Sequence, residues 1–160
     1  MKKTFVTTSI KVVLLIVATI ATFGTSARAQ SLDYGFKVNI PFDFMVDGKT
    51  LPAGQYSVAR ALPGSGDLVL QIGSVNGHSR AVPLTIPVNS LKSRDRASLV
   101  FHRFDDQYFL SQVWPAAGNY GREIAKSRSE RQAEKRFRES VGALMKPDSV
   151  GTVVVLADLQ

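Results

Sequence analysis

The residues of this chain that could do chemistry gather within one stretch of ten residues. They are His102, Asp105, Asp106 and Ser111. A hydroxyl nucleophile needs a base, and the base needs an orienting carboxylate, so Ser111, His102 and Asp105 have the composition of a hydrolase triad. Together with both aspartates, His102 also has the composition of a site for zinc or a hard, oxygen-preferring ion.

The rest of the sequence gives little support to either kind of site. No Gly-x-Ser-x-Gly motif of a nucleophile elbow occurs. The absence of cysteine excludes thiolate zinc sites, iron–sulfur clusters, thiol nucleophiles and disulfide scaffolds, and His78 and His102 are the only histidines. A hairpin turn with His102 packed on Phe109 is the simpler interpretation. The sequence therefore predicts no catalytic residue, metal or cofactor, and a small hydrolase or metal-dependent enzyme centred on the His102 hairpin is the alternative.

A β-hairpin is predicted to position these residues. Its strands are Ser98–Phe104 and Gln107–Trp114, on either side of Asp105-Asp106. With a two-residue loop, cross-strand pairing places His102 opposite Phe109 and Val100 opposite Ser111. His102 and Ser111 are then diagonal neighbours on one face.

Aromatic side chains near this hairpin are a second candidate binding surface. Alternation along the second strand puts Tyr108 and Trp114 on one face with Leu110 and Gln112, and Tyr120 follows in the sequence. Such rings can stack on a sugar or an aromatic ligand. Both a stacking platform and a layer of the hydrophobic core stay open.

Most of the chain has the pattern of short β-strands. Even-numbered residues from Tyr34 to Val46 are apolar, and Pro41 divides this run into two strands with a corner or one bulged edge strand, with Phe42 and Phe44 in the core. Two prolines in Arg80–Val88 predict an edge strand, whereas residues 150–157 predict a buried last strand. Seven or eight strands with Gly/Pro turns predict an antiparallel β-sandwich or a partly open barrel.

One C-terminal segment, residues 120–144, is predicted to be a charged α-helix instead. An apolar strip at helical spacing consists of Ala133, Phe137, Val141 and Leu144. A basic face on roughly the opposite side consists of Arg128, Arg131, Lys135 and Arg138. Spacing also predicts the i,i+4 ion pairs Lys126–Glu130 and Glu134–Arg138.

Residues 1–29 have the pattern of a secretory signal peptide. A basic start and a short apolar run, Val12–Phe23, precede the small-x-small motif Ala27-Arg28-Ala29. The run is too short for a stable membrane span, so we expect cleavage before Gln30 and a periplasmic or extracellular protein. Residues 30–160 then form a single exported domain.

The positive charge of the mature protein lies in one segment. Residues 1–29 hold four of the 20 basic groups and none of the 13 acidic groups, which leaves a net charge of +3. Residues 122–139 hold seven basic and four acidic groups, so they account for this whole excess. The basic face is therefore a candidate site for an anionic envelope component, namely a lipid headgroup, lipopolysaccharide or acidic polysaccharide, or for an envelope protein. A solvated, solubilising face is the alternative, and no nucleic acid partner is expected.

Five motifs occur in fixed order along residues 36–130. They are IPFDF at 40–44, LPAGQY at 51–56, LVFHRF at 99–104, QYFLSQVW at 107–114 and GRE at 121–123. Together they resemble a set of uncharacterised exported proteins common in acidobacteria, over about 95 residues. The resemblance implies export and a small β domain and brings no activity. With a β scaffold and few reactive side chains, the sequence predicts a non-catalytic binding or structural module of the bacterial cell envelope.

Overall fold

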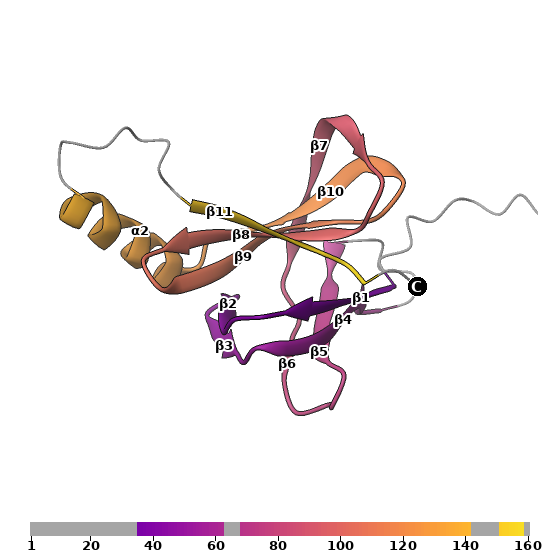
Figure 1. Cartoon of the computed structure of the whole chain (residues 1–160), viewed down its shortest axis with the longest axis horizontal. Coiled ribbons are helices and arrows are strands. Elements are labelled where there is room, and N and C mark those ends of the chain that lie inside the picture. Colours follow the sequence, from indigo (N-terminus) through magenta and orange to yellow (C-terminus); the bar gives the residue numbers. More distant parts are fainter. Residues whose placement is uncertain (1–34, 63–67, 142–150, 159–160) are drawn as a thin grey trace, which may run out of the picture. The chain divides into compact units, whose positions relative to one another are not determined.

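Two β-sheets and one α-helix form the part of the chain that the structure describes (Figure 1). The computed structural model describes residues 35–62, 68–141 and 151–158. The predicted mainly β fold with one C-terminal charged helix is confirmed, and the two sheets are consistent with a β-sandwich. The described residues hold eleven strands rather than seven or eight, because several strands are only two or three residues long.

The smaller sheet has four antiparallel strands in the order β1-β4-β5-β6. Their bounds are β1 Phe36–Ile40, β4 Gly54–Arg60, β5 Leu70–Ser74 and β6 Arg80–Ala81. Asn76-Gly77, a dipeptide favoured in tight hairpin turns, lies between β5 and β6, and Gly77 takes a positive φ of 78° there. Glycine suits this position because side chains rarely adopt that conformation.

The larger sheet has seven strands, five of them in the order β11-β8-β9-β10-β7. The bounds are β7 Thr85–Arg94, β8 Ser98–Phe104, β9 Gln107–Trp114, β10 Gly118–Ile124 and β11 Gly151–Leu156, with β2 Phe44–Val46 and β3 Lys49–Leu51 at the side. β2 pairs with β3 and also meets β9 in parallel, through Met45 and Phe109. Because β1 and β2 belong to different sheets, the prediction of two strands with a corner at Pro41 is confirmed.

The hydrophobic core lies between the two sheets. Val38, Tyr56 and Ile72 from the smaller sheet and Phe44 and Phe101 from the larger one are almost completely buried in one cluster. The Phe44 ring packs edge-on against Tyr56 and Phe101, with centroid distances of 5.1 and 5.5 Å. Phe44 is therefore a core residue as predicted, and Phe42 packs at the margin of this cluster.

A β-bulge changes the predicted register of the β8–β9 hairpin. His102 opposes Phe109 as predicted and Phe101 opposes Leu110, but Val100 opposes Gln112, not Ser111. The extra residue shifts the alternation, so Leu110 and Val113 share the core face while Trp114 turns away from it. The prediction that Tyr108, Leu110, Gln112 and Trp114 share one face is therefore wrong.

The edge position was predicted for one of the two outer strands of the larger sheet and not for the other. The predicted edge strand Arg80–Val88 is divided between β6 and the start of β7, and each of these lies at the edge of its own sheet. β11 lies at the other edge of the larger sheet, so the prediction of a buried last strand is wrong, although its position in the sequence is right. Val153 and Val155 pack on the core, whereas Val154 and Leu156 are about half exposed.

The helix α2, Arg128–Val141, begins later than predicted. Residues 118–124 form β10 instead, because they pair with both β7 and β9 and bury Gly121 and Ile124. These inter-strand hydrogen bonds outweigh the helical propensity of a charged sequence. Within the described residues, no helix has the length and apolar character needed to span a membrane.

Candidate functional site

The start of α2 is fixed by a local hydrogen-bond motif. The backbone N–H of Glu130 donates to Ser127 Oγ at 3.1 Å, so Ser127 caps the helix. The spacing of Ser127 and Glu130 is that of a capping box, a signal in the sequence that predicts the observed start. The guanidinium of Arg131 donates to the carbonyl of Lys126 and holds the preceding residue against the first turn.

The apolar strip of α2 docks the helix on the outer side of the β8–β9 hairpin. Ala133 is buried against Phe104 and Phe109, and Phe137 is partly buried beside them, with its ring centroid 6.0 Å from that of Phe104. The predicted docking strip is confirmed for these two helix residues. The side chains of Val141 and Leu144 lie outside the described residues.

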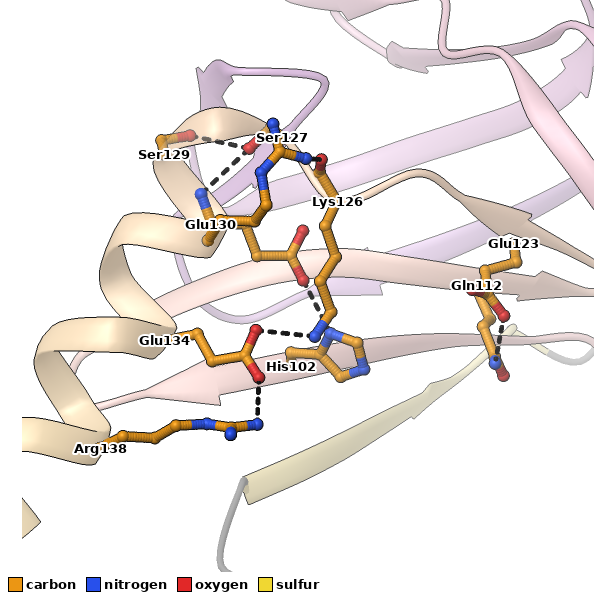
Figure 2. A network of polar contacts seen from close by, with 10 residues as sticks. His102, Gln112, Glu123, Lys126, Ser127, Ser129, Glu130, Glu134 and Arg138 are labelled. Atoms are coloured by element: carbon orange, nitrogen blue, oxygen red, sulfur yellow. Dashed lines mark hydrogen bonds and ion pairs between the residues drawn. The ribbon is translucent and has the colours of Figure 1, made fainter. Parts of the chain in front are cut away.

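A polar contact between His102 and Glu130 joins the sheet to the helix beside this cluster (Figure 2). Nδ1 of His102 lies 2.8 Å from Oε1 of Glu130, and only 5% of the glutamate side chain is exposed. Because a carboxylate accepts hydrogen bonds, we assign the hydrogen to Nδ1. His102 therefore serves helix docking, through a partner 28 residues away in the sequence.

The neighbouring carboxylate of Glu134 is held by two bases. Lys126 Nζ lies 2.8 Å from Oε2, and Arg138 Nη2 lies 2.6 Å from Oε1 (Figure 2). The hydrogen bond from Lys126 lowers the pKa of Glu134, with a further contribution from Arg138, although desolvation acts in the opposite direction. The predicted Glu134–Arg138 pair is confirmed. The Lys126–Glu130 pair is wrong, since Lys126 precedes the helix and helical spacing does not apply to it.

The basic face of α2 is exposed along its whole length. Arg128, Arg131, Lys135 and Arg138 are all exposed, and 78% of the Lys135 side chain and 65% of the Arg138 side chain are accessible. The last three of these residues, with Glu134 and Glu139, line a surface groove of about 430 Å³. Lys135 lies 3.8 Å from Glu139, whose exposed carboxylate neutralises part of this surface.

The aspartates of the hairpin turn do not assemble a catalytic or metal site with His102. Asp105 takes a positive φ of 52° in the turn and its carbonyl accepts a hydrogen bond from Arg103 Nε, while Asp106 lies 3.8 Å from Arg103. No cluster of three potential metal ligands occurs among the described residues. In the same part of the chain, no hydroxyl is hydrogen-bonded to His102, so Ser111 and Asp105 do not form a hydrolase triad with it, the alternative that the sequence left open.

The three aromatic residues are not assembled into one stacking platform. Tyr108 stacks on Phe42, with a centroid distance of 3.9 Å, and packs against the main core. Trp114 is 97% buried, with Arg94 lying 4.4 Å from the centroid of its ring, and Tyr120 is about half exposed. The interpretation of the first two rings as packing residues is therefore favoured.

No protein-family model, curated protein or solved structure matches this chain. Any functional assignment therefore depends on the geometry of the described residues, and the basic face of α2 is the surface with the clearest chemical character.

The His102–Glu130 contact predicts a specific loss of stability. His102→Ala leaves the buried carboxylate without its hydrogen-bond donor, and we expect the free energy of unfolding to fall by about 1–3 kcal/mol. His102→Asn is the matched control, because its side-chain amide can donate from nearly the position of Nδ1 and should lose less. Urea denaturation checks both variants. Equal stability of the alanine variant and the parent would contradict the docking role of His102.

Proposed function

We propose that this protein is an exported, non-catalytic binding module of the bacterial cell envelope, and that the basic face of α2 binds phosphate-bearing lipid headgroups. Phospholipid headgroups and the phosphates of lipopolysaccharide share this chemistry. The partner fits the charge of the surface, since each basic residue close to an anionic membrane contributes about 1 kcal/mol to binding.

The proposal rests on how charged side chains are distributed between the buried and the exposed sides of α2. Glu130 turns inward to His102, and Glu134 is held between Lys126 and Arg138. The four bases of the basic face are exposed, with Arg138 in contact with Glu134, and Glu139 is the exposed acid among them. The accessible side of the helix thus has a larger excess of basic over acidic side chains than the helix as a whole. This excess favours a binding surface over a merely solubilising one.

Neutralising the basic face should abolish most vesicle binding without unfolding the protein. In a four-site variant, Arg128, Arg131, Lys135 and Arg138 are replaced by Gln, which keeps the helix-forming character of the segment. We expect affinity for phosphatidylglycerol vesicles to fall by about 100-fold or more, measured by co-sedimentation. Stability should change little, because exposed ion pairs contribute only about 0–1 kcal/mol each. Parent binding should also weaken as salt shortens the Debye length from about 10 Å at 0.1 M to about 3 Å at 1 M.

A charge-matched pair of variants separates the site from net charge. Arg128→Gln with Lys135→Gln removes two charges from α2, whereas Lys37→Gln with Lys49→Gln removes two exposed charges from β1 and β3. Binding should decrease in the first variant and persist in the second. Equal binding in both would contradict a site on α2.

The enzyme alternative has one specific observation in its favour, the carboxylate that orients His102. It lacks a nucleophile, since no described hydroxyl hydrogen-bonds the imidazole. Ester or phosphoester hydrolysis by the purified protein that disappears in His102→Ala would favour this alternative and contradict the non-catalytic proposal.

Removal of the signal peptide during export should shorten the protein. Residues 1–29 lie outside the described residues, so this part of the proposal rests on their sequence pattern alone. We expect the exported protein to begin at Gln30, because cleavage follows Ala27-Arg28-Ala29. Intact-mass spectrometry of the periplasmic and extracellular fractions measures this. A full-length mass, Met1–Gln160, in the membrane fraction would show an uncleaved anchor instead.

A further inference from the structure

A row of apolar side chains is exposed where the chain passes from β6 to β7. Val82, Leu84 and Ile86 have exposed fractions of 40%, 73% and 56%, whereas the intervening residues Pro83 and Thr85 are buried. The apolar phase of this alternating segment therefore faces outward. We call Val82, Leu84 and Ile86 the apolar edge row.

A fourth apolar residue extends this surface sideways. Leu68 is 54% exposed, and its carbonyl accepts a hydrogen bond from Thr85 Oγ1 at 3.1 Å. Its neighbour Val69 forms a β-bridge with Leu84. The exposed side chains are thus neighbours on two adjoining segments, unlike the isolated apolar residues common on protein surfaces.

The surroundings of the apolar edge row have a definite charge pattern. Residues 81–91 contain no charged group, and the exposed bases Arg80 and Lys92 flank them. Residues 80–94 contain no acid at all. One acid, Glu123, is the direct cross-strand partner of Ile86, and its carboxylate accepts a hydrogen bond from Gln112 Nε2. An apolar row with basic ends complements the interface of an anionic bilayer, where acyl chains lie beneath negative headgroups.

The backbone of this edge is poorly suited to a partner strand. β7 is the outer strand of its sheet, and Pro87 within it has no N–H to donate. Proline of this kind disfavours the ladder that an added strand would need. The hydrated headgroup region of a bilayer makes no such demand, because water and polar headgroups can pair with the free backbone groups while apolar side chains lie deeper.

We propose that the apolar edge row inserts into the interface of a lipid bilayer, with Val82, Leu84 and Ile86 at the boundary between headgroups and acyl chains. This inference goes beyond the headgroup binding proposed for α2, because it concerns hydrophobic contact. Its contribution should consequently resist salt, which screens only the electrostatic part of binding.

A single fluorescent label tests the insertion directly. The chain has no cysteine, so Leu84→Cys provides one attachment site for an environment-sensitive fluorophore in the otherwise intact mature protein. With phosphatidylglycerol vesicles we expect a blue shift that persists at about 1 M salt and is quenched by lipids carrying a nitroxide on the acyl chain. The same label at Asn39→Cys, exposed on β1, should show neither effect. Adding Ile86→Asp to the Leu84 probe should weaken partitioning by about tenfold or more.

The outcomes separate this inference from the proposal for α2. A blue shift that is retained in the four-site α2 variant supports insertion. If this variant also binds vesicles as well as the parent does, the α2 site is refuted and insertion is not. Absence of a shift while vesicles still bind the parent overturns insertion and leaves headgroup binding intact. A shift that grows with protein concentration without lipid would identify a second copy of this chain as the occupant, and would also overturn insertion.

Discussion

Replacing Phe44 by alanine should reduce the free energy of unfolding by about 3–5 kcal/mol. Phe44 is 99% buried between the two sheets, and its ring contacts both Tyr56 and Phe101. The alanine variant loses the transfer free energy of the ring and leaves a cavity that the strands on either side cannot fill. Domains of this size are typically stable by about 5–15 kcal/mol, so the loss threatens folding itself.

The neighbouring Phe42 provides an internal comparison. It is only partly buried and stacks on Tyr108 at the margin of the core, so Phe42→Ala should cost clearly less than Phe44→Ala. Thermal and urea denaturation measure both. A Phe44→Ala variant that melts within a degree or two of the parent would show that this ring does not occupy the core.

A methyl group added at Gly121 should be unusually disruptive. A Cβ atom there would lie 2.6 Å from two ring atoms of Trp114, well inside van der Waals contact. The ring has little freedom to move, because it is 97% buried, contacts Arg94 and donates a hydrogen bond from Nε1 to Gln112. We expect Gly121→Ala to destabilise the protein toward the upper end of the overpacking range of about 1–3 kcal/mol.

Two variants test this cause. Gly73→Ala is the matched control, since Gly73 is also a buried strand glycine but its added Cβ would meet only Gln71 Nε2 at 3.9 Å. In a Trp114→Leu background, Gly121→Ala should cost much less than in the parent, because the clashing ring is gone. An unchanged cost in that background would exclude the Trp114 contact as the reason.

Alternation of apolar and polar residues predicted the positions of strands well, but it did not predict which set of alternating residues faces the core. Alternation identified β1, β2, β8 and β9, and the predicted pair of His102 with Phe109 is present in the β8–β9 hairpin. The bulge at Ser111 was invisible in the sequence, because any residue of a strand can be the extra one. Val82, Leu84 and Ile86 alternate with Pro83 and Thr85, but only the tertiary structure decided which of the two sets is exposed. The Pro83 carbonyl accepts a hydrogen bond from Leu70, the Thr85 hydroxyl donates one to Leu68, and both residues are buried.

The sequence by itself determined the mainly β fold, the turns, and both faces of α2, because each of these depends on residues that are neighbours along a strand or a helical turn. The spacing of Ser127 and Glu130 is also a local signal for the start of the helix, but the predicted start at residue 120 missed it. Tertiary structure alone decided the contact of His102 with Glu130, and hence the inward turn of this acid that makes the outer side of α2 basic. Contacts between residues far apart in the chain depend on how the sheets and helix pack, and no local periodicity encodes that packing.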